Sequence, residues 1–270
     1  MKLAQGIKEQ LKHLLSVRHR DENEALNNGL RLLSKWRSVL IQNTVLKYNG
    51  TVVLQGPLKG LDFIERSAEG CHIAKLIGCY EQPLQPYIID AIASGFKNIV
   101  NIGCAEGYYA VGLARVLPGS ISVACDTDPK AQAACLELAK KNGVEERVEV
   151  RGTFTHADFE SLDASHSLIF CDIEGAEDQL LDPEKAPNLT RLNIIVESHE
   201  CLVPGITDRL INRFEKSHTI TRIDDNGSRT LKNPPDWFYK MSHLDQLLAT
   251  WEWRSGPTPW LVMTPKANIK

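Results

Sequence analysis

The sequence lacks an excess of charge of either sign. Its 270 residues carry 31 lysines and arginines against 34 aspartates and glutamates, which gives a formal net charge of −3. A chain this close to neutrality has no general electrostatic footprint for nucleic acid or for an anionic membrane. We therefore expect neither a nucleic acid nor a membrane among its partners.

The sequence also lacks any apolar run of the roughly 20 residues that a membrane helix requires. Residues 1–10 carry charge at short intervals and no apolar core, unlike a secretory signal peptide. The seven cysteines form no Cys-x-x-Cys pair and no zinc-finger spacing with histidine. An odd number of thiols in apolar stretches indicates free cysteines in a reducing compartment, so we expect a soluble cytoplasmic protein.

What is present is an ordinary globular composition, 43% hydrophobic and 24% charged. The length allows one large domain with an appendage, and the pattern changes near residue 97. We predict an N-terminal helical and hairpin extension over 1–96 and a main domain over 97–270. The extension is expected to contain helices over 1–48, broken by a polar patch at 18–28, short strands at 51–54 and 61–64, and helices near 71–77 and 83–93.

From residue 97 onward, short β-branched runs alternate with helical segments. Such alternation predicts an α/β fold, a mostly parallel seven-stranded sheet with helices on both faces. Ligands of these sheets bind beyond the carboxyl ends of the strands. The expected strands are Asn98–Ile102, Ile121–Cys125, Val148–Val150, Ser167–Cys171, Ile194–Val196, Thr219–Ile223 and Trp260–Met263, with helices at Tyr108–Val116 and Pro129–Lys141.

The turn after the first of these strands contains two glycines four residues apart, Gly103 and Gly107. Glycines at this place let the backbone approach a ligand, and the following helix offers unpaired N–H groups. The loop is neither Gly-x-Gly-x-x-Gly nor a P-loop, which disfavours nicotinamide dinucleotides and nucleoside triphosphates. By itself the motif is equally typical of a turn that binds nothing.

The second strand ends in two carboxylates, Asp126 and Asp128. An acid about 20 residues after a glycine loop is placed to accept hydrogen bonds from the hydroxyls of a ribose. Asp128, followed by Pro129, has the features of a helix cap. We assign the cap to Asp128 and the ribose to Asp126, which together favour a nucleoside-containing cofactor.

This combination resembles the class I S-adenosylmethionine-dependent methyltransferases. Residues 168–177, Leu-Ile-Phe-Cys-Asp-Ile-Glu-Gly-Ala-Glu, and residues 194–199, Ile-Ile-Val-Glu-Ser-His, resemble the signature of the FkbM-type group. The resemblance covers roughly residues 97–200. It implies a Rossmann-like fold, S-adenosylmethionine as cofactor, and methyl transfer to a hydroxyl of a small-molecule or glycan acceptor such as a sugar or secondary metabolite.

The resemblance also implies which residues hold the cofactor. The family usually carries an acid where this chain has Asn101, so the contact with the methionine amino group passes to Glu106 or Asp172 if Asn101 does not make it. In this fold the end of the third strand usually reads the adenine. The expected cofactor-binding residues are Asn101, Gly103, Glu106, Gly107, Asp126, Thr127, Gly152, Thr153 and Asp172.

Acidic side chains and one histidine follow the fourth and fifth strands. His199 is the expected base that removes the proton of an acceptor hydroxyl, while Asp172 or Glu174 orients the acceptor or screens the sulfonium charge. A second interpretation is a Mg²⁺ or Mn²⁺ ion held by Asp172, Glu197 and His199. A structural role for part of the cluster, such as Glu177 at a helix start, is the third.

The segment 225–259 contains tryptophans, prolines and glycines and is interpreted as a lid inserted before the last strand. Trp237 and Arg254 are candidate acceptor-binding residues in this lid, and Tyr80 and Glu81 are candidates ahead of the first strand. Core packing accounts for the aromatic residues equally well, and Arg254 is suited either to an anionic substrate group or to Glu252.

Two other functions compete with O-methylation. An N-methyltransferase of a peptide or protein often carries Asn/Asp-Pro-Pro-Tyr after the fourth strand, whereas here Asn233-Pro234-Pro235 lies in the lid. A non-catalytic binding module would be expected to lose the glycine loop or the ribose acid, and both are present. The N-terminal helices are suited to a homodimer contact or to packing on the main domain.

Overall fold

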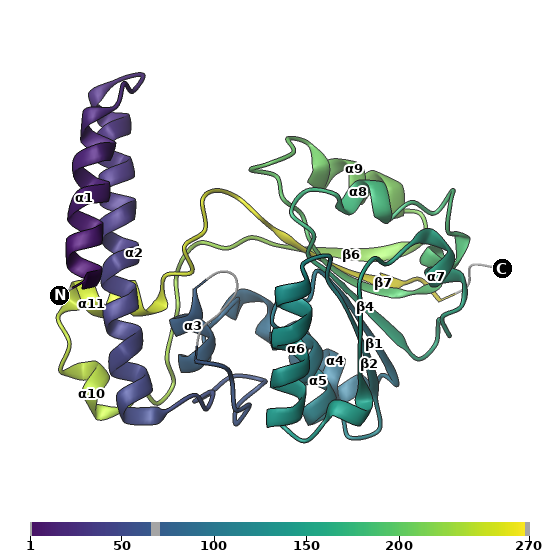
Figure 1. The fold of residues 1–270 in the computed structure, drawn as a ribbon. Helices are drawn as coiled ribbons and strands as arrows, with labels where there is room; N and C mark the ends of the chain where they lie inside the picture. The colour runs from purple at the N-terminus through teal and green to yellow at the C-terminus, as the bar shows by residue number, and fades with distance from the viewer. Residues whose placement is uncertain (1, 66–70, 268–270) are drawn as a thin grey trace.

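The computed structural model describes residues 2–65 and 71–267, and it contains one seven-stranded sheet (Figure 1). The strand order is β3-β2-β1-β4-β5-β7-β6; β7 runs antiparallel to both neighbours, and the other pairs are parallel. This is the mostly parallel seven-stranded α/β sheet that the sequence predicts. The strands are β1 (Asn98–Ile102), β2 (Ile121–Cys125), β3 (Val148–Arg151), β4 (Ser167–Cys171), β5 (Asn193–Glu197), β6 (His218–Ile223) and β7 (Trp260–Pro265).

Alternate side chains of the central strands enter two separate cores, one on each face of the sheet. On β4, Leu168 and Phe170 belong to the core that contains α4, α5 and α6, whereas Ile169 and Cys171 belong to the core beneath α9. Helices therefore cover both faces, as predicted. The α-helices are α1 (Lys2–Ser16), α2 (Glu22–Asn49), α3 (His72–Ile77), α4 (Gln85–Ser94), α5 (Tyr108–Val116), α6 (Pro129–Lys141), α7 (His156–Glu160), α8 (Glu177–Leu180), α9 (Ile206–Phe214), α10 (Asp236–Tyr239) and α11 (His243–Thr250).

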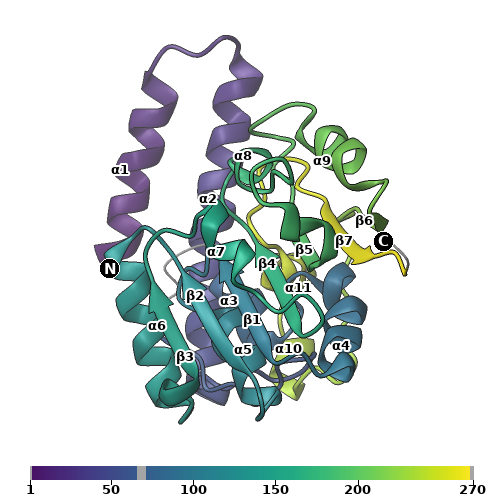
Figure 2. The ribbon, with the colours of Figure 1, turned by 90° about the vertical axis from the view of Figure 1, so that its right-hand side faces the viewer.

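The N-terminal helices form a hairpin whose far end stands away from the sheet (Figures 1 and 2). The break between them is shorter than the predicted polar patch, because Asp21 accepts a hydrogen bond from the backbone N–H of Glu24 and starts α2 at Glu22. The C-terminal half of α2 returns to the body of the molecule, where Ile41 and Val45 are buried in the same core as α5.

The prediction of two strands at 51–54 and 61–64 is wrong. Only one bridge forms, between Val52 and Asp62. The intervening loop turns twice at glycines with positive φ, Gly56 and Gly60, and buries Leu58 against Gly112 of α5. The segment is thus a compact loop packed on the core rather than a hairpin ladder.

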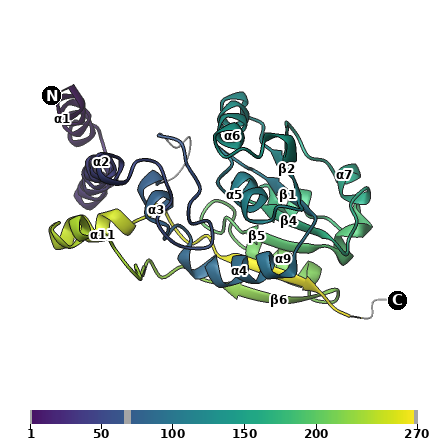
Figure 3. The same ribbon diagram turned by 90° about the horizontal axis from the view of Figure 1, so that it is seen from below.

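The predicted lid packs on the N-terminal extension. Helix α11 lies beside α2 (Figure 3), where the Arg37 guanidinium donates to both carboxylate oxygens of Asp245 at 2.7 and 2.6 Å. Trp237 of α10 stacks on Tyr48 and donates its indole N–H to Asn49 at 2.7 Å. The division of the chain at residue 97 stays a prediction.

Two expectations from composition have structural counterparts. All seven cysteines are free thiols, six of them buried and Cys201 exposed. Within residues 2–65 and 71–267, every helix is too short or too polar to cross a membrane.

Candidate functional site

A cavity of about 740 Å³ lies at the carboxyl ends of β1 to β4; we call it the strand-tip cavity. Each of the four strands contributes to its lining through the residues that follow the strand. These are Gly103 after β1, Asp126 and Thr127 after β2, Gly152 and Thr153 after β3, and Asp172 after β4. The cavity therefore brings together six of the nine predicted cofactor-binding residues.

Gly103 is required by the closeness of two strand ends. Its φ is +79°, and a Cβ at this position would lie 1.6 Å from the carbonyl oxygen of Asp172. The backbone N–H groups of Gly103 and Cys104 donate to the carbonyl of Cys125. No larger residue is compatible with this turn. Because glycine has no side chain, space remains open beside the loop.

Of the two carboxylates after β2, Asp128 has the helix-capping role that the sequence predicts. Its side chain accepts from the backbone N–H of Lys130 at 2.9 Å and caps α6. Asp126 accepts from the N–H of Ala105 and from that of Asp128, both at 2.9 Å. These bonds fix the Asp126 carboxylate in the cavity lining, where the ribose role stays a prediction.

Three predicted cofactor residues do not line the strand-tip cavity. Asn101 is buried and donates its amide to the carbonyl of Phe170 at 3.4 Å, across the β1–β4 pair. Glu106 is fully buried and pairs with Lys75 of α3, Oε1 to Nζ, at 2.5 Å. Gly107 starts α5 at φ +90°, and a Cβ there would lie 2.6 Å from the Cys135 sulfur. In this structure all three residues contact the protein interior around the glycine loop and do not face the strand-tip cavity.

A second cavity of about 330 Å³ adjoins the first and shares Gly103, Asp172 and Glu174 with it; we call it the side cavity. Its lining comes from distant parts of the chain, including Tyr80 ahead of the sheet, His199 after β5 and Arg254 of the lid segment. Of the residues predicted to bind the acceptor, Tyr80 and Arg254 therefore reach this cavity.

His199 lines the side cavity, where a buried carboxylate holds its ring. Its Nδ1 lies 2.6 Å from Oε1 of Glu177, a side chain with no exposed surface. Because a carboxylate accepts, Nδ1 is the donor of this bond, and Nε2 is the ring nitrogen that remains for another partner. The same Glu177 oxygen also accepts from the N–H groups of Ile173 and Gly175, so it orders the loop after β4.

The free nitrogen of His199 faces carboxylates. Nε2 lies 3.6 Å from Oδ1 of Asp172 and 3.4 Å from Oε2 of Glu174, a residue in the left-handed region at φ +54°. Burial lowers the pKa of His199, but the hydrogen bond that the ring donates to Glu177 and the nearby carboxylates outweigh burial and raise the pKa above its ordinary value. Burial, together with Glu197 and Glu81, raises the pKa of Asp172 well above its usual range.

The predicted metal-ligand set needs a correction. Ligand atoms of Asp172, Glu174 and His199 lie within 4.8 Å of one another, so among the described residues these three form a group able to hold a divalent cation. Glu197 is not in this group, because its carboxylate is bonded to the Arg254 guanidinium. Glu177, for which sequence reasoning offered only a helix-start role, is the partner that orients His199.

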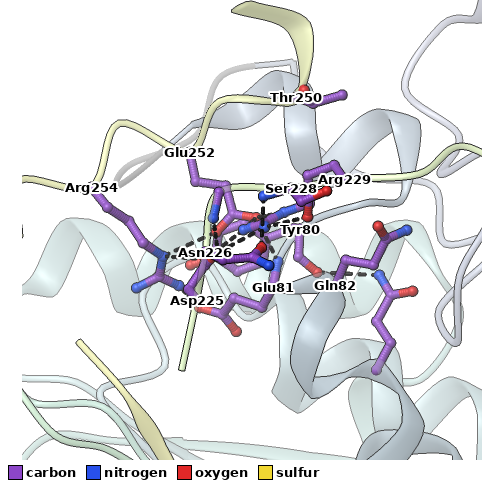
Figure 4. A network of polar contacts seen from close by, with 12 residues as sticks. Tyr80, Glu81, Gln82, Asp225, Asn226, Ser228, Arg229, Thr250, Glu252 and Arg254 are labelled. Carbon is purple, nitrogen blue, oxygen red and sulfur yellow. Dashed lines mark hydrogen bonds and ion pairs between the residues drawn. The ribbon is translucent and has the colours of Figure 1, made fainter. Parts of the chain in front are cut away.

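Arg254 is surrounded by acids, as Figure 4 shows from close by. Its guanidinium donates to Glu81 at 2.9 Å, to Glu252 at 3.1 Å and to Glu197. Arg229 completes the network by bonding Glu252 and Asp225. Of the two predicted partners for Arg254, Glu252 is therefore present, and the guanidinium is already neutralised.

Two predicted acceptor residues lie away from the side-cavity lining. Glu81 is buried, accepts from the Tyr109 hydroxyl at 2.5 Å and has its pKa raised to about 8 by burial and by Glu197. Trp237 packs against α2 instead of facing either cavity. Sequence reasoning missed Arg31 and Lys35 of α2, which line the side cavity, because nothing in the local sequence indicates where α2 docks.

Comparison with known proteins finds similarity to methyltransferases in part of this chain. Residues 88–178, about a third of the chain, match a family model described as O-methyltransferase. A "Ribosomal protein L11 methyltransferase" of Methylococcus capsulatus is 39% identical over 74 residues, which are 27% of this chain and 25% of that protein. The chain thus spans about a quarter of the length of this curated relative.

Solved structures with a similar arrangement include an O-methyltransferase from Bacillus cereus in complex with SAH, at 19% identity and a TM-score of 0.47, covering 69% of this chain and 81% of that one. The O-methyltransferase TomG from Streptomyces achromogenes, in complex with SAM, has 17% identity and a TM-score of 0.43, covering 70% and 82%.

The matched segment contains most of the residues that line the strand-tip cavity. It runs from α4 through the glycine loop and β2 to the start of α8, and it includes Asp126, Thr153 and Asp172. The residues present fit a nucleoside cofactor: a fixed carboxylate at the β2 tip, open space beside Gly103, and a polar turn after β3. The expected cofactor, S-adenosylmethionine, agrees with this lining and with the O-methyltransferase description of the matched family model.

Proposed function

We propose that this chain is an S-adenosylmethionine-dependent O-methyltransferase of the FkbM type, acting on a hydroxyl of a sugar, glycan or other secondary metabolite. The observation that carries the proposal is His199. A histidine oriented by a buried glutamate lines the side cavity, and its Nε2 is turned toward Asp172 and Glu174, which line both cavities. The FkbM assignment rests on residues 168–177 and 194–199, which supply Asp172, Glu177 and His199.

The residues of the site divide the reaction between positioning and proton removal. The bound cofactor supplies an electrophilic methyl group on a sulfonium. Asp126 binds the ribose hydroxyls. Asp172 lines both cavities, and its ionised form favours a positive charge beside it. His199 accepts the proton of the acceptor hydroxyl at Nε2 while Glu177 stabilises the resulting imidazolium.

The direct test is methyl transfer from tritiated S-adenosylmethionine to a panel of sugars, sugar acids, sugar phosphates and hydroxylated metabolites. The protein is expected to label at least one of them, and His199→Gln, which keeps size and a hydrogen bond to Glu177, is expected to reduce the rate by roughly 10²–10⁴-fold. Equal rates for the two proteins would contradict the role of His199. A label found only on protein would contradict the acceptor class.

The second candidate function is methylation of a peptide or protein. It is favoured by the 74-residue match to a ribosomal protein methyltransferase. Against it, Asn233-Pro234-Pro235 lies beside α10 in the segment docked on α2, away from the tip of β4. Incubation of cell extract with labelled cofactor, followed by separation of protein from small molecules, distinguishes the two.

A divalent cation is the alternative role of the Asp172, Glu174 and His199 group. Bound there, Mg²⁺ or Mn²⁺ would lower the pKa of a coordinated hydroxyl. We assign His199 the role of base, and the account therefore expects that dialysis against EDTA leaves the rate within about twofold. Loss of activity on dialysis, restored by Mg²⁺, would transfer the role to a metal.

A further inference from the structure

The lining of the side cavity includes two cations that the proposed reaction does not use. Arg31 and Lys35 lie one helical turn apart on α2 and both line this cavity, opposite in charge to the Asp172, Glu174 and His199 group. The other two cations of the lining are neutralised: Lys75 pairs with Glu106, and Arg254 pairs with four carboxylates.

Arg31 is held in place by the backbone of the lid segment. Its guanidinium donates to the carbonyl oxygen of Trp253 at 2.6 Å and to that of Arg254 at 3.2 Å. Neutral carbonyls leave its positive charge uncompensated. Trp253 itself has φ +65°, an uncommon and strained conformation for an aromatic residue, of the kind that clusters at binding sites.

Lys35 lies over the ring of Trp253, with Nζ 5.1 Å from the ring centroid. Within the described part of the chain, neither Lys35 nor Arg31 makes an ion pair with a carboxylate. Burial and the neighbouring Arg31 lower the pKa of Lys35, as expected for two cations that share a site without an anion. The indole N–H of Trp253 is buried and has no partner among the described residues.

We propose that Arg31 and Lys35 form an anion subsite for the acceptor, so that the methylated hydroxyl belongs to a compound that also carries a carboxylate or phosphate group. The inference rests on the proposed function and narrows its acceptor class. The acceptor lies along the side cavity, its hydroxyl at His199 and its anionic group at α2. The N-terminal extension thereby takes part in specificity, and Lys35 is a specificity-determining residue.

The test observes Trp253 directly. In protein with ¹⁵N-labelled tryptophan, the indole signal of Trp253, assigned through Trp253→Phe, is followed during titration with inorganic phosphate at constant ionic strength, with and without saturating S-adenosylhomocysteine. We expect a saturable shift whose affinity falls about tenfold or more in Lys35→Gln. Lys47→Gln, an exposed lysine on the same helix outside both cavities, is the matched control and is expected to leave the affinity unchanged.

The outcomes separate this inference from the proposed function. Absence of a saturable shift, or a shift that Lys35→Gln leaves unchanged and that therefore reports an adventitious ion only, overturns the subsite, whatever the cofactor does. Phosphate binding without S-adenosylhomocysteine binding overturns the proposed function instead. In the acceptor panel, a neutral sugar methylated as efficiently as its phosphate or its acid would also overturn the subsite.

Discussion

At the scale of single residues, the site depends on carboxylates in fixed hydrogen-bonded positions. Glu177 orients His199, and Asp126 is itself fixed by two backbone N–H groups. Such preorganised groups need no rearrangement when a ligand arrives. The most informative substitutions are therefore at residues whose hydrogen-bond partners are known. Each is compared with a residue of similar chemistry and a different role.

The raised pKa of His199 predicts the direction of the pH dependence. The base must be neutral, so kcat/KM should rise with pH and level off above a midpoint that is higher than the ordinary 6.5. The limb should disappear in His199→Gln, measured on the best acceptor of the panel. A midpoint at or below 6.5, or a limb that persists in the variant, would contradict the assignment.

Asp126 and Asp128 form a matched pair for the cofactor site. Asp126→Ala removes the carboxylate assigned to the ribose and is expected to weaken S-adenosylhomocysteine binding by roughly 30-fold or more, about 2 kcal/mol. Asp128→Ala removes a helix cap and is expected to reduce the free energy of unfolding by about 1 kcal/mol while binding is retained. The reverse pattern, in calorimetry and denaturant unfolding, would exchange the two roles.

At the scale of elements, the lid segment is anchored on α2. Trp237→Phe removes the hydrogen bond to Asn49 and is expected to lower the free energy of unfolding by about 1 kcal/mol. Because Trp237 lies outside both cavities, cofactor affinity and methyl-transfer rate should remain unchanged. An effect on the Michaelis constant of the acceptor, with stability unaffected, would restore Trp237 to the binding site.

The main-domain elements could be predicted from sequence because their signals are local. Asn98–Ile102 and Ser167–Cys171 are short buried runs bounded by turn residues, and the structure has both at the predicted bounds. The prediction of two strands within 51–64 is wrong because Leu58 is buried in the core, and this tertiary contact leaves no signal in the local sequence. Likewise, the metal-ligand group contains Glu174 instead of the predicted Glu197, because Glu197 is bonded to Arg254, which lies 57 residues further along the chain.

At the scale of the whole molecule, one hydrophobic core joins the extension to the sheet. It contains Ile41 and Val45 of α2, Leu76 of α3, Ile99 of β1 and Phe170 of β4. Groups that share one core unfold together. We therefore expect a single calorimetric unfolding transition, raised by roughly 5–10 °C at a cofactor-product concentration 100 times its Kd. Two separate transitions would show that the extension unfolds independently.

The central claim, that the strand-tip cavity is an S-adenosylmethionine site, is tested most directly by titrating the folded protein with S-adenosylhomocysteine in a calorimeter, with NAD as the control ligand. The account predicts one site per chain with micromolar affinity and no heat from NAD. A folded sample that binds NAD, or that binds neither ligand, would contradict it.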